Sequence, residues 1–211
     1  MIVDLSHNLH SDMPVYPGDR NVEIIPTKIH ENGGYNVHSI SMSSHTGTHV
    51  DAPYHVRPGG DTVDSPEVLD ACIGDALVID VSSRLDGIEI TPESLGTATE
   101  RIKPGDRLLL TTGWSDLFGT DDFFRNYPSL SIELTRLLIG KSVALIGIET
   151  PSVHYEKNDL IHEMLLSNGI IIVENLANLK KLGEGRVFFS AAPLKLRGID
   201  GSTVRAYAIP K

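Results

Sequence analysis

One segment of the chain, "SSHTGTHVDAPYHV" at residues 43–56, holds the residues best suited to chemistry. Three imidazoles and one carboxylate fall within eleven positions of it: His45, His49, Asp51 and His55. The whole chain has nine histidines in 211 residues, so this is a local enrichment. Imidazole and carboxylate groups are common ligands of zinc and related cations, so the spacing indicates a metal site. Scattered surface histidines, a proton-sensing patch and a purely structural metal site are the alternatives.

The histidine segment is expected to be extended and bent rather than helical. A helix would put His45 and His49 on adjacent turns, but the intervening Thr-Gly-Thr and the following Pro53 disfavour one. In a strand, alternate residues share a face, so the candidate ligands would point the same way. Because four extended residues span ~13 Å, Gly47 must bend the chain before both histidines can share a metal ion.

Two further polar residues lie beside apolar runs. Glu174 follows "IIIV" at the end of a predicted buried strand, where a carboxylate is costly unless it is paired or binds a metal. The ends of such strands are also where α/β proteins place their sites. His162 lies on the predicted helix just before, and with Glu174 it makes a second candidate ligand set. Structural roles explain three other residues equally well, and they are left outside the predicted site: Asp116, Glu149 and His154.

The composition limits the class of protein. The length, with 40% apolar and 22% charged residues, fits one folded domain over 1–211. The net charge of −10 disfavours nucleic acid and anionic membranes as partners. The single cysteine, Cys72, allows neither an internal disulfide nor a cysteine-based zinc site. The N-terminus lacks the pattern of a secretory signal, and no apolar run approaches the ~18 residues of a membrane span, so a cytoplasmic protein is expected.

Many short strands and few helices are expected along the chain. The strand candidates are residues 2–6, 22–29, 37–42, 76–82, 107–113, 143–149, 169–175, 186–194 and 203–209. Alternation at 37–42 predicts a half-buried antiparallel strand, whereas 143–149 and 169–175 should be buried on both faces. Helices are predicted at 131–140, capped by Ser131, at 158–169, capped by Asn158, and more weakly at 91–100. This pattern predicts a single α/β domain with a mixed β-sheet.

The segment "HTGTHVDAPYH" resembles the HxGTHxDxPxH signature of the cyclase family of metal-dependent hydrolases, which includes bacterial kynurenine formamidases and isatin hydrolases. Three more stretches are similar to that family: "MPVYPGD" (13–19), "LIGIETPSV" (145–153) and "HEMLLSNGIIIVENLANL" (162–179). The resemblance therefore extends over most of the chain. It implies a swivelling β/β/α fold, a homodimer or homotetramer, and an active site near a subunit interface.

The resemblance also implies roles for the candidate residues. His45 and His49 would bind one metal ion and His162 a second. Asp51 and Glu174 would bridge the two ions. The cofactor would then be two divalent metal ions per subunit; imidazole and carboxylate suit Zn²⁺, and Mn²⁺ or iron are compatible.

The predicted function is a metal-dependent amidohydrolase acting on a small-molecule amide, such as the arylformamide N-formylkynurenine. His55 would be the acid/base that takes a proton from the attacking water and returns it to the leaving nitrogen. Tyr16 is the candidate substrate-binding residue, and it stands where kynurenine formamidases usually have tryptophan. The alternatives are isatin-hydrolase-like opening of a cyclic amide or ester, and a non-catalytic metal-binding protein.

Overall fold

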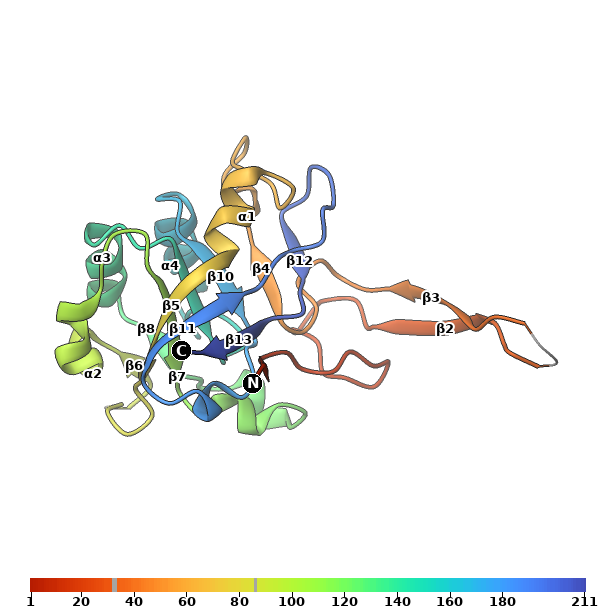
Figure 1. The fold of residues 1–211 in the computed structure, drawn as a ribbon, viewed down its shortest axis with the longest axis horizontal. Helices are drawn as coiled ribbons and strands as arrows, with labels where there is room; N and C mark the ends of the chain where they lie inside the picture. The colour runs from red at the N-terminus through yellow and green to blue at the C-terminus, as the bar shows by residue number, and fades with distance from the viewer. Residues whose placement is uncertain (32–33, 86) are drawn as a thin grey trace.

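The computed structural model describes residues 1–31, 34–85 and 87–211. It consists of an α/β body from which a long hairpin arm projects (Figure 1). The arm is formed by β2 (Glu23–Lys28) and β3 (Val37–Ser41), which pair in antiparallel fashion. The two chain termini lie close together on the body, away from the tip of the arm (Figure 1).

A nine-stranded sheet runs through the body. In spatial order its strands are β1 (Val3–Asp4), β13 (Tyr207–Pro210), β11 (Gly185–Ser190), β5 (Ile73–Asp80), β7 (Arg107–Thr111), β9 (Leu145–Ile148), β10 (Ile171–Glu174), β4 (His49–Asp51) and β12 (Gly201–Thr203). The four strands from β5 to β10 are parallel, and the strands outside them pair in antiparallel fashion. The prediction of a mixed α/β sheet is therefore confirmed.

Four α-helices pack around the sheet of the described residues: α1 (Pro66–Cys72), α2 (Pro92–Leu95), α3 (Ile132–Gly140) and α4 (Asn158–Leu166). A short parallel pair, β6 (Glu89–Ile90) and β8 (Ser129–Leu130), lies beside them. Ser131 caps α3 as predicted, because its side chain accepts a hydrogen bond from the Leu134 amide at 3.1 Å. The cap predicted for α4 is wrong. Lys157 precedes that helix, and the Asn158 side chain instead accepts a 2.7 Å hydrogen bond from the Ser152 hydroxyl.

The central parallel strands are buried on both faces, as predicted for residues 143–149 and 169–175. Along β5, Leu77 and Ile79 pack into one core with the apolar residues of α2, α3 and α4. Ala76 and Val78 face the opposite way, into a second core that includes residues of α1. Each parallel strand therefore needs apolar residues in consecutive positions, which is why these runs are continuous rather than alternating.

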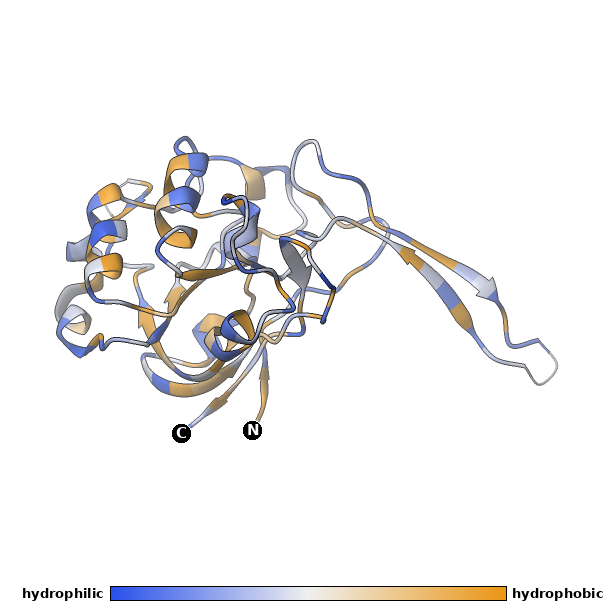
Figure 2. Cartoon of the chain, turned by 90° about the horizontal axis from the view of Figure 1, so that it is seen from above, coloured by the Kyte–Doolittle hydropathy of each residue, from blue (hydrophilic) through white to orange (hydrophobic). Residues whose placement is uncertain are grey.

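The prediction for residues 37–42 is wrong about burial. The segment is an antiparallel strand, but within the described part of the chain β3 pairs with β2 alone, and most of its residues are exposed. Apolar segments nevertheless lie along both strands of the arm (Figure 2). Alternation in a sequence indicates a strand with two chemically different faces; it does not say whether the same chain covers either face. No helix of the described residues is both long and apolar enough to cross a membrane.

Candidate metal centre

The register of two neighbouring strands brings the first candidate ligands together. β4 pairs with β10 so that His49 lies directly opposite Glu174. Paired residues of an antiparallel ladder share one face of the sheet, and Asp51, two residues after His49, shares it too. Val50, between them, points into the opposite core. Strand alternation alone therefore turns these three polar side chains toward the side of the sheet that carries α4.

Gly47 makes the predicted bend, with φ of 63°. This left-handed conformation favours glycine, and a Cβ here would also lie 2.7 Å from Leu9 Cδ2, so that the Leu9 side chain would have to move. The carbonyl oxygen of Gly47 accepts hydrogen bonds from His49 Nδ1 at 2.7 Å and from Asn175 Nδ2 at 3.1 Å. The bend folds His45 back until its Nδ1 is 2.7 Å from Asp51 Oδ1.

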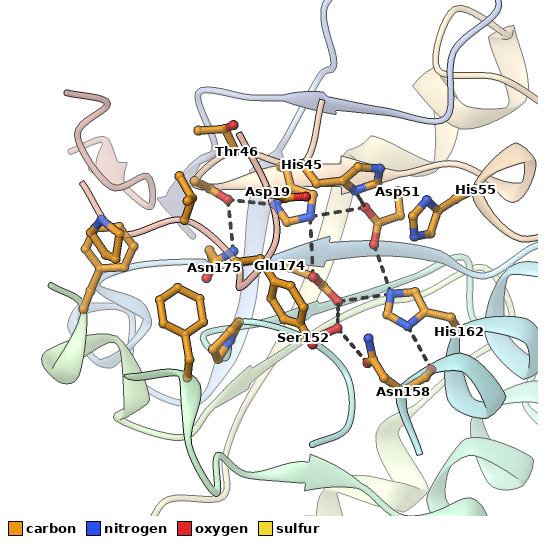
Figure 3. A pocket seen from close by; sticks show the side chains of 18 residues that line it. Asp19, His45, Thr46, Asp51, His55, Ser152, Asn158, His162, Glu174 and Asn175 are labelled. Atoms are coloured by element: carbon orange, nitrogen blue, oxygen red, sulfur yellow. Dashed lines mark hydrogen bonds and ion pairs between the residues drawn. The ribbon is translucent and has the colours of Figure 1, made fainter. Parts of the chain in front are cut away.

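The two carboxylates each lie between two imidazoles. His49 Nε2 is 3.3 Å from Asp51 Oδ1 and 3.4 Å from Glu174 Oε2. His162 Nε2, from α4, is 3.5 Å from Asp51 Oδ2 and 3.3 Å from Glu174 Oε1. Each carboxylate thus presents one oxygen to each imidazole, as Figure 3 shows from close by for His162. The imidazoles and carboxylates are thus close enough together to hold a divalent cation.

Backbone carbonyls set the orientation of two of these imidazoles. His49 Nδ1 lies against the Gly47 oxygen, and His162 Nδ1 is 3.0 Å from the Asn158 oxygen one helical turn earlier. Because a carbonyl oxygen only accepts, Nδ1 carries the proton in both rings. The lone pair of each neutral ring is therefore on Nε2, which faces the carboxylates.

The chemistry of the cluster fits divalent cations. Three overlapping groups of residues could each hold a cation, because within each group the ligand atoms lie within 4.8 Å of one another. Two of these groups share Asp51. Asp51 Oδ2 is buried, and among the residues that the structure describes it has no hydrogen bond shorter than its 3.5 Å contact with His162 Nε2. Burial alone would lower the pKa of His162, but hydrogen bonds and charge from Asp51 and Glu174 raise it to about 10. A buried cluster that attracts protons so strongly is a site for positive charge.

A cavity of about 200 Å³ opens above this cluster. Its lining includes Tyr16 from the N-terminal loop, and Phe118 and Phe124 from the loop that follows β7. The Tyr16 and Phe124 rings meet edge to face, with centroids 6.1 Å apart. The cavity therefore places an aromatic wall next to a buried group of carboxylates and imidazoles, in a volume at the small end for ligand pockets.

His55 lies at the rim of the cavity, at the end of a 3₁₀ turn formed by Pro53–His55. Its ring centroid is 4.3 Å from that of His45 and 5.5 Å from that of His162. Its side chain is 32% exposed, whereas the candidate ligands His49 and His162 are almost fully buried. His55 thus lies at the edge of the cluster, next to His45, where solvent can reach it.

Besides the aromatic residues Phe118 and Phe124, two polar residues of the site were missed by the sequence analysis. The single proton of the Ser152 hydroxyl is shared between two acceptors, Glu174 Oε1 at 2.9 Å and Asn158 Oδ1 at 2.7 Å. Asp200, just before β12, contacts both His45 and His55. Its hydrogen bond with His45 outweighs burial and holds the pKa of Asp200 well below its usual value, so it is an anion. The turn-like run "GIDGST" carried no signal for this role, because the contact joins residues more than 140 positions apart.

Glu149, left outside the predicted site, is buried in a separate place. Its carboxylate accepts hydrogen bonds from the Thr112 and Gly113 amides, each at 2.7 Å, and from the Ser115 hydroxyl at 3.0 Å. These contacts anchor the start of the loop that continues to Phe118 and Phe124. Glu149 is therefore not among the cavity-lining groups, although it supports the segment that carries the aromatic wall.

Gly201 provides the space that His45 occupies. A Cβ at this position would lie 2.7 Å from His45 Cε1 and 2.8 Å from Nε2. The Gly201→Ala variant is therefore expected to displace the ring and to weaken metal binding at least tenfold, as measured by titration calorimetry of the metal-stripped protein. Gly140→Ala, at the end of α3 where a Cβ meets open space, is the control. Equal metal affinity in Gly201→Ala and wild type would argue against His45 as a ligand.

The chain is similar to known proteins over nearly its whole length. Residues 3–155 match the model of the Cyclase family. A kynurenine formamidase of Bacillus cereus is 34% identical, with 99% of this chain and 97% of the relative covered. Isatin hydrolase A from Labrenzia aggregata, solved with benzyl benzoate, is 30% identical with a TM-score of 0.88, over 100% of this chain and 93% of that one. A potential metal-dependent hydrolase with cyclase activity is 29% identical with a TM-score of 0.83, over 99% and 96% of the two chains.

The chain belongs to the cyclase family of metal-dependent hydrolases. Its fold is that of the solved family members, and its relatives indicate a hydrolase that acts on amide C–N bonds with the help of a divalent metal.

Proposed function

We propose that this protein hydrolyses a small aryl amide, of which N-formylkynurenine is the leading candidate. The observation that carries the proposal is the aromatic wall beside the carboxylate–imidazole cluster, in one cavity of about 200 Å³. An arylformamide has the matching parts: an aromatic ring to stack on Tyr16 and a small carbonyl group to reach the cluster. The similarity to kynurenine formamidases supports the same choice.

The proposed cofactor is a pair of divalent ions, with Zn²⁺ preferred and Mn²⁺ as the alternative. His45, His49 and Asp51 would hold one ion; His162 would hold the other, and Asp51 and Glu174 would bridge them. When bound, such ions lower the pKa of water to about 7 and polarise a carbonyl oxygen. The bridging carboxylates also keep two positive charges close together without strong repulsion.

His55 is the proposed acid/base. Amide hydrolysis adds the oxygen of water to the carbonyl carbon, breaks the C–N bond and delivers a proton to the leaving nitrogen. An imidazole can take the proton from water and return it to that nitrogen. The position of His55 at the rim of the cavity, beside His45 and His162, supports this role.

The deciding experiment measures metal content and hydrolysis together. Protein purified without chelator is assayed with N-formylkynurenine and with isatin, then stripped of metal and reloaded. Close to two ions per chain, with hydrolysis of N-formylkynurenine lost on stripping and regained on reloading, is the expected result. Faster hydrolysis of isatin would favour the cyclic-amide alternative. Two observations support that alternative: the similarity to isatin hydrolase A, and Tyr16 at the position where kynurenine formamidases usually have tryptophan. Failure to bind any divalent ion would refute the proposal.

We further propose that the protein is a homodimer or homotetramer in which the β2–β3 arm packs against a second copy. Ile25 and Ile40 are 53% and 59% exposed. They lie on opposite faces of the arm, because Ile40 pairs with Ile24 whereas Ile25 pairs with Ser39. An isolated two-stranded hairpin is only marginally stable in water, so an arm with apolar residues on both faces needs a partner surface.

The double variant Ile25→Ser/Ile40→Ser is expected to lower the molar mass in solution to that of the 23.0 kDa chain. Light scattering after size-exclusion chromatography measures this change. Leu69→Ser, which replaces an exposed apolar residue on α1 instead of on the arm, should leave the oligomer intact. A wild-type protein that is already a monomer at micromolar concentration would rule out the proposed assembly.

Residues from both halves of the chain line the cavity, which supports one catalytic domain over 1–211. The cytoplasmic location stays a prediction.

A further inference from the structure

A backbone hydrogen bond fixes the position of Asp200 beside the histidine segment, residues 43–56. It lies immediately before β12, and its carbonyl oxygen accepts a 2.8 Å hydrogen bond from the Ala52 amide. Its side chain is 34% exposed, so the carboxylate lies at the edge of the cluster, unlike the fully buried Asp51. This position is established by the pairing of β12 with β4, which also seats Gly201 opposite Asp51.

The carboxylate of Asp200 joins two imidazoles with different proposed roles. Its Oδ2 is 2.8 Å from His45 Nε2 and 3.3 Å from His55 Nδ1. Its Oδ1 accepts a hydrogen bond from the Ser44 hydroxyl at 3.2 Å, which limits rotation of the carboxylate. One oxygen atom therefore contacts both the candidate ligand and the candidate acid/base.

The contact with His45 has a consequence for metal binding. A neutral imidazole has one N–H and one lone pair, and metal-bound histidines commonly donate the N–H to a carboxylate. In the metal-free structure a carboxylate faces each ring nitrogen of His45, so each nitrogen can donate a proton. Asp200 would hold the proton on Nε2, so that a bound metal ion could take the place of the proton on Nδ1. That nitrogen is on the side of the ring nearest Asp51, at 2.7 Å from its Oδ1. For His45 the ligand atom would thus be Nδ1, whereas His49 and His162 would use Nε2.

The contact with His55 works in the same way. Asp200 accepts the Nδ1 proton, so the neutral ring keeps its lone pair on Nε2. The acceptor also limits rotation of a side chain that is otherwise partly exposed. Nε2 is then the nitrogen available to exchange protons in the cavity.

We infer that Asp200 is a positioning residue that orients His45 for metal binding through Nδ1 and His55 for proton transfer through Nε2. This inference depends on the proposed function, because it assigns Asp200 a task toward the metal and toward the acid/base. One side chain then couples the metal site to the proton path, so its loss should affect both.

The test compares Asp200→Ala and Asp200→Asn with wild type and with Asp61→Asn, a variant of an exposed aspartate on a nearby loop. Calorimetric titration of Mn²⁺ and Zn²⁺ into metal-stripped protein gives the affinity and the number of ions bound. Nitrogen-15 NMR of the imidazoles reports which ring nitrogen carries the proton in His45 and His55. Rates with a saturating metal concentration give kcat and KM.

In Asp200→Ala the metal dissociation constant should rise roughly 10- to 100-fold, with the same number of ions bound at saturation. The kcat should fall by about the same factor at saturating metal while KM stays within about twofold, because the proton-transferring ring is no longer aligned. The imidazoles of His45 and His55 should show mixed tautomers. Asp200→Asn, which keeps an acceptor oxygen, should lie between Ala and wild type.

Two results would overturn the inference, and they differ from failure of the proposed function. Unchanged affinity and unchanged imidazole tautomers in Asp200→Ala would mean that Asp200 positions neither ring. Loss of one bound ion per chain would mean that Asp200 is itself a ligand, since His45, His55 and Asp200 also lie close enough to form a cation site. By contrast, a wild-type protein that binds no metal would contradict the proposed function itself.

Discussion

Replacing Glu174 with glutamine is expected to abolish hydrolysis and to remove the stabilisation that metal gives. Glu174 lies between His49 and His162 with one oxygen toward each, at 3.4 and 3.3 Å, so both ions would lose a ligand. Loss of a hydrogen-bond partner of a metal ligand typically lowers metal affinity roughly 10- to 100-fold. Loss of the ligand Glu174 itself should lower the affinity by more. In wild type, metal at 1,000 times its dissociation constant adds about 4 kcal/mol to the free energy of unfolding. The variant should show almost none of this gain, which thermal melts with and without metal measure.

The metal-free Glu174→Gln protein should remain folded. In the metal-free cluster the negative charge of Asp51 disfavours ionisation of Glu174, whereas His162 and His49 favour it. Removing the charge of Glu174 relieves the first interaction and loses the others, so the effects on the free energy of unfolding partly cancel. The matched control is Glu163→Gln, a neighbour of His162 whose own side chain is exposed on α4. Retention of metal-dependent stabilisation by Glu174→Gln would contradict the assignment of Glu174 as a bridging ligand.

Replacing His55 with alanine is expected to lower kcat by about 10²- to 10⁴-fold while metal binding is retained. The ring lies at the rim of the cavity and does not enter the ligand cluster, so its removal should leave the melting temperature of the loaded protein nearly unchanged. Added imidazole should restore part of the activity, since the truncated side chain leaves space for it. Steady-state kinetics and calorimetric metal titration measure the two effects separately.

His10→Ala, which removes an exposed imidazole on the N-terminal loop, is the control for His55→Ala. It should keep wild-type kinetics and metal affinity. Full activity of metal-loaded His55→Ala would remove His55 from the mechanism. Loss of metal together with activity would instead place His55 among the ligands, and the proton transfer would need another group.

The candidate ligands were predictable because local rules decide their directions. Strand alternation places His49 and Asp51 on one face whatever the rest of the chain does. Gly47 is the residue in the segment that can adopt the bend at φ of 63°. A carboxylate directly after an apolar run, as at Glu174, is costly without a counter-charge, and this cost marks the position even before the fold is known.

The fold was predictable in its type and less so in its boundaries. Continuous apolar runs predicted strands buried on both faces, and β9 and β10 are such strands; the structure adds that they pair in parallel. The helix α1 and the strand β12 were missed, because neither has a periodic apolar pattern long enough to be distinguished from a turn. The prediction for Asn158 failed because its side chain bonds to Ser152 from another segment instead of capping its own helix.

The sequence by itself determined the chemistry of the cluster: which residues face the same way, where the chain bends, and that imidazoles and carboxylates rather than cysteines must hold any metal. Only the tertiary structure decided how those groups are supported. The pairing of β12 with β4 brings Asp200 to His45 and His55 and leaves space above Gly201, and the projection of the arm exposes Ile25 and Ile40. The physical reason is range: alternation and turn geometry act over a few residues, whereas these contacts join segments far apart in the chain through the order of strands in the sheet.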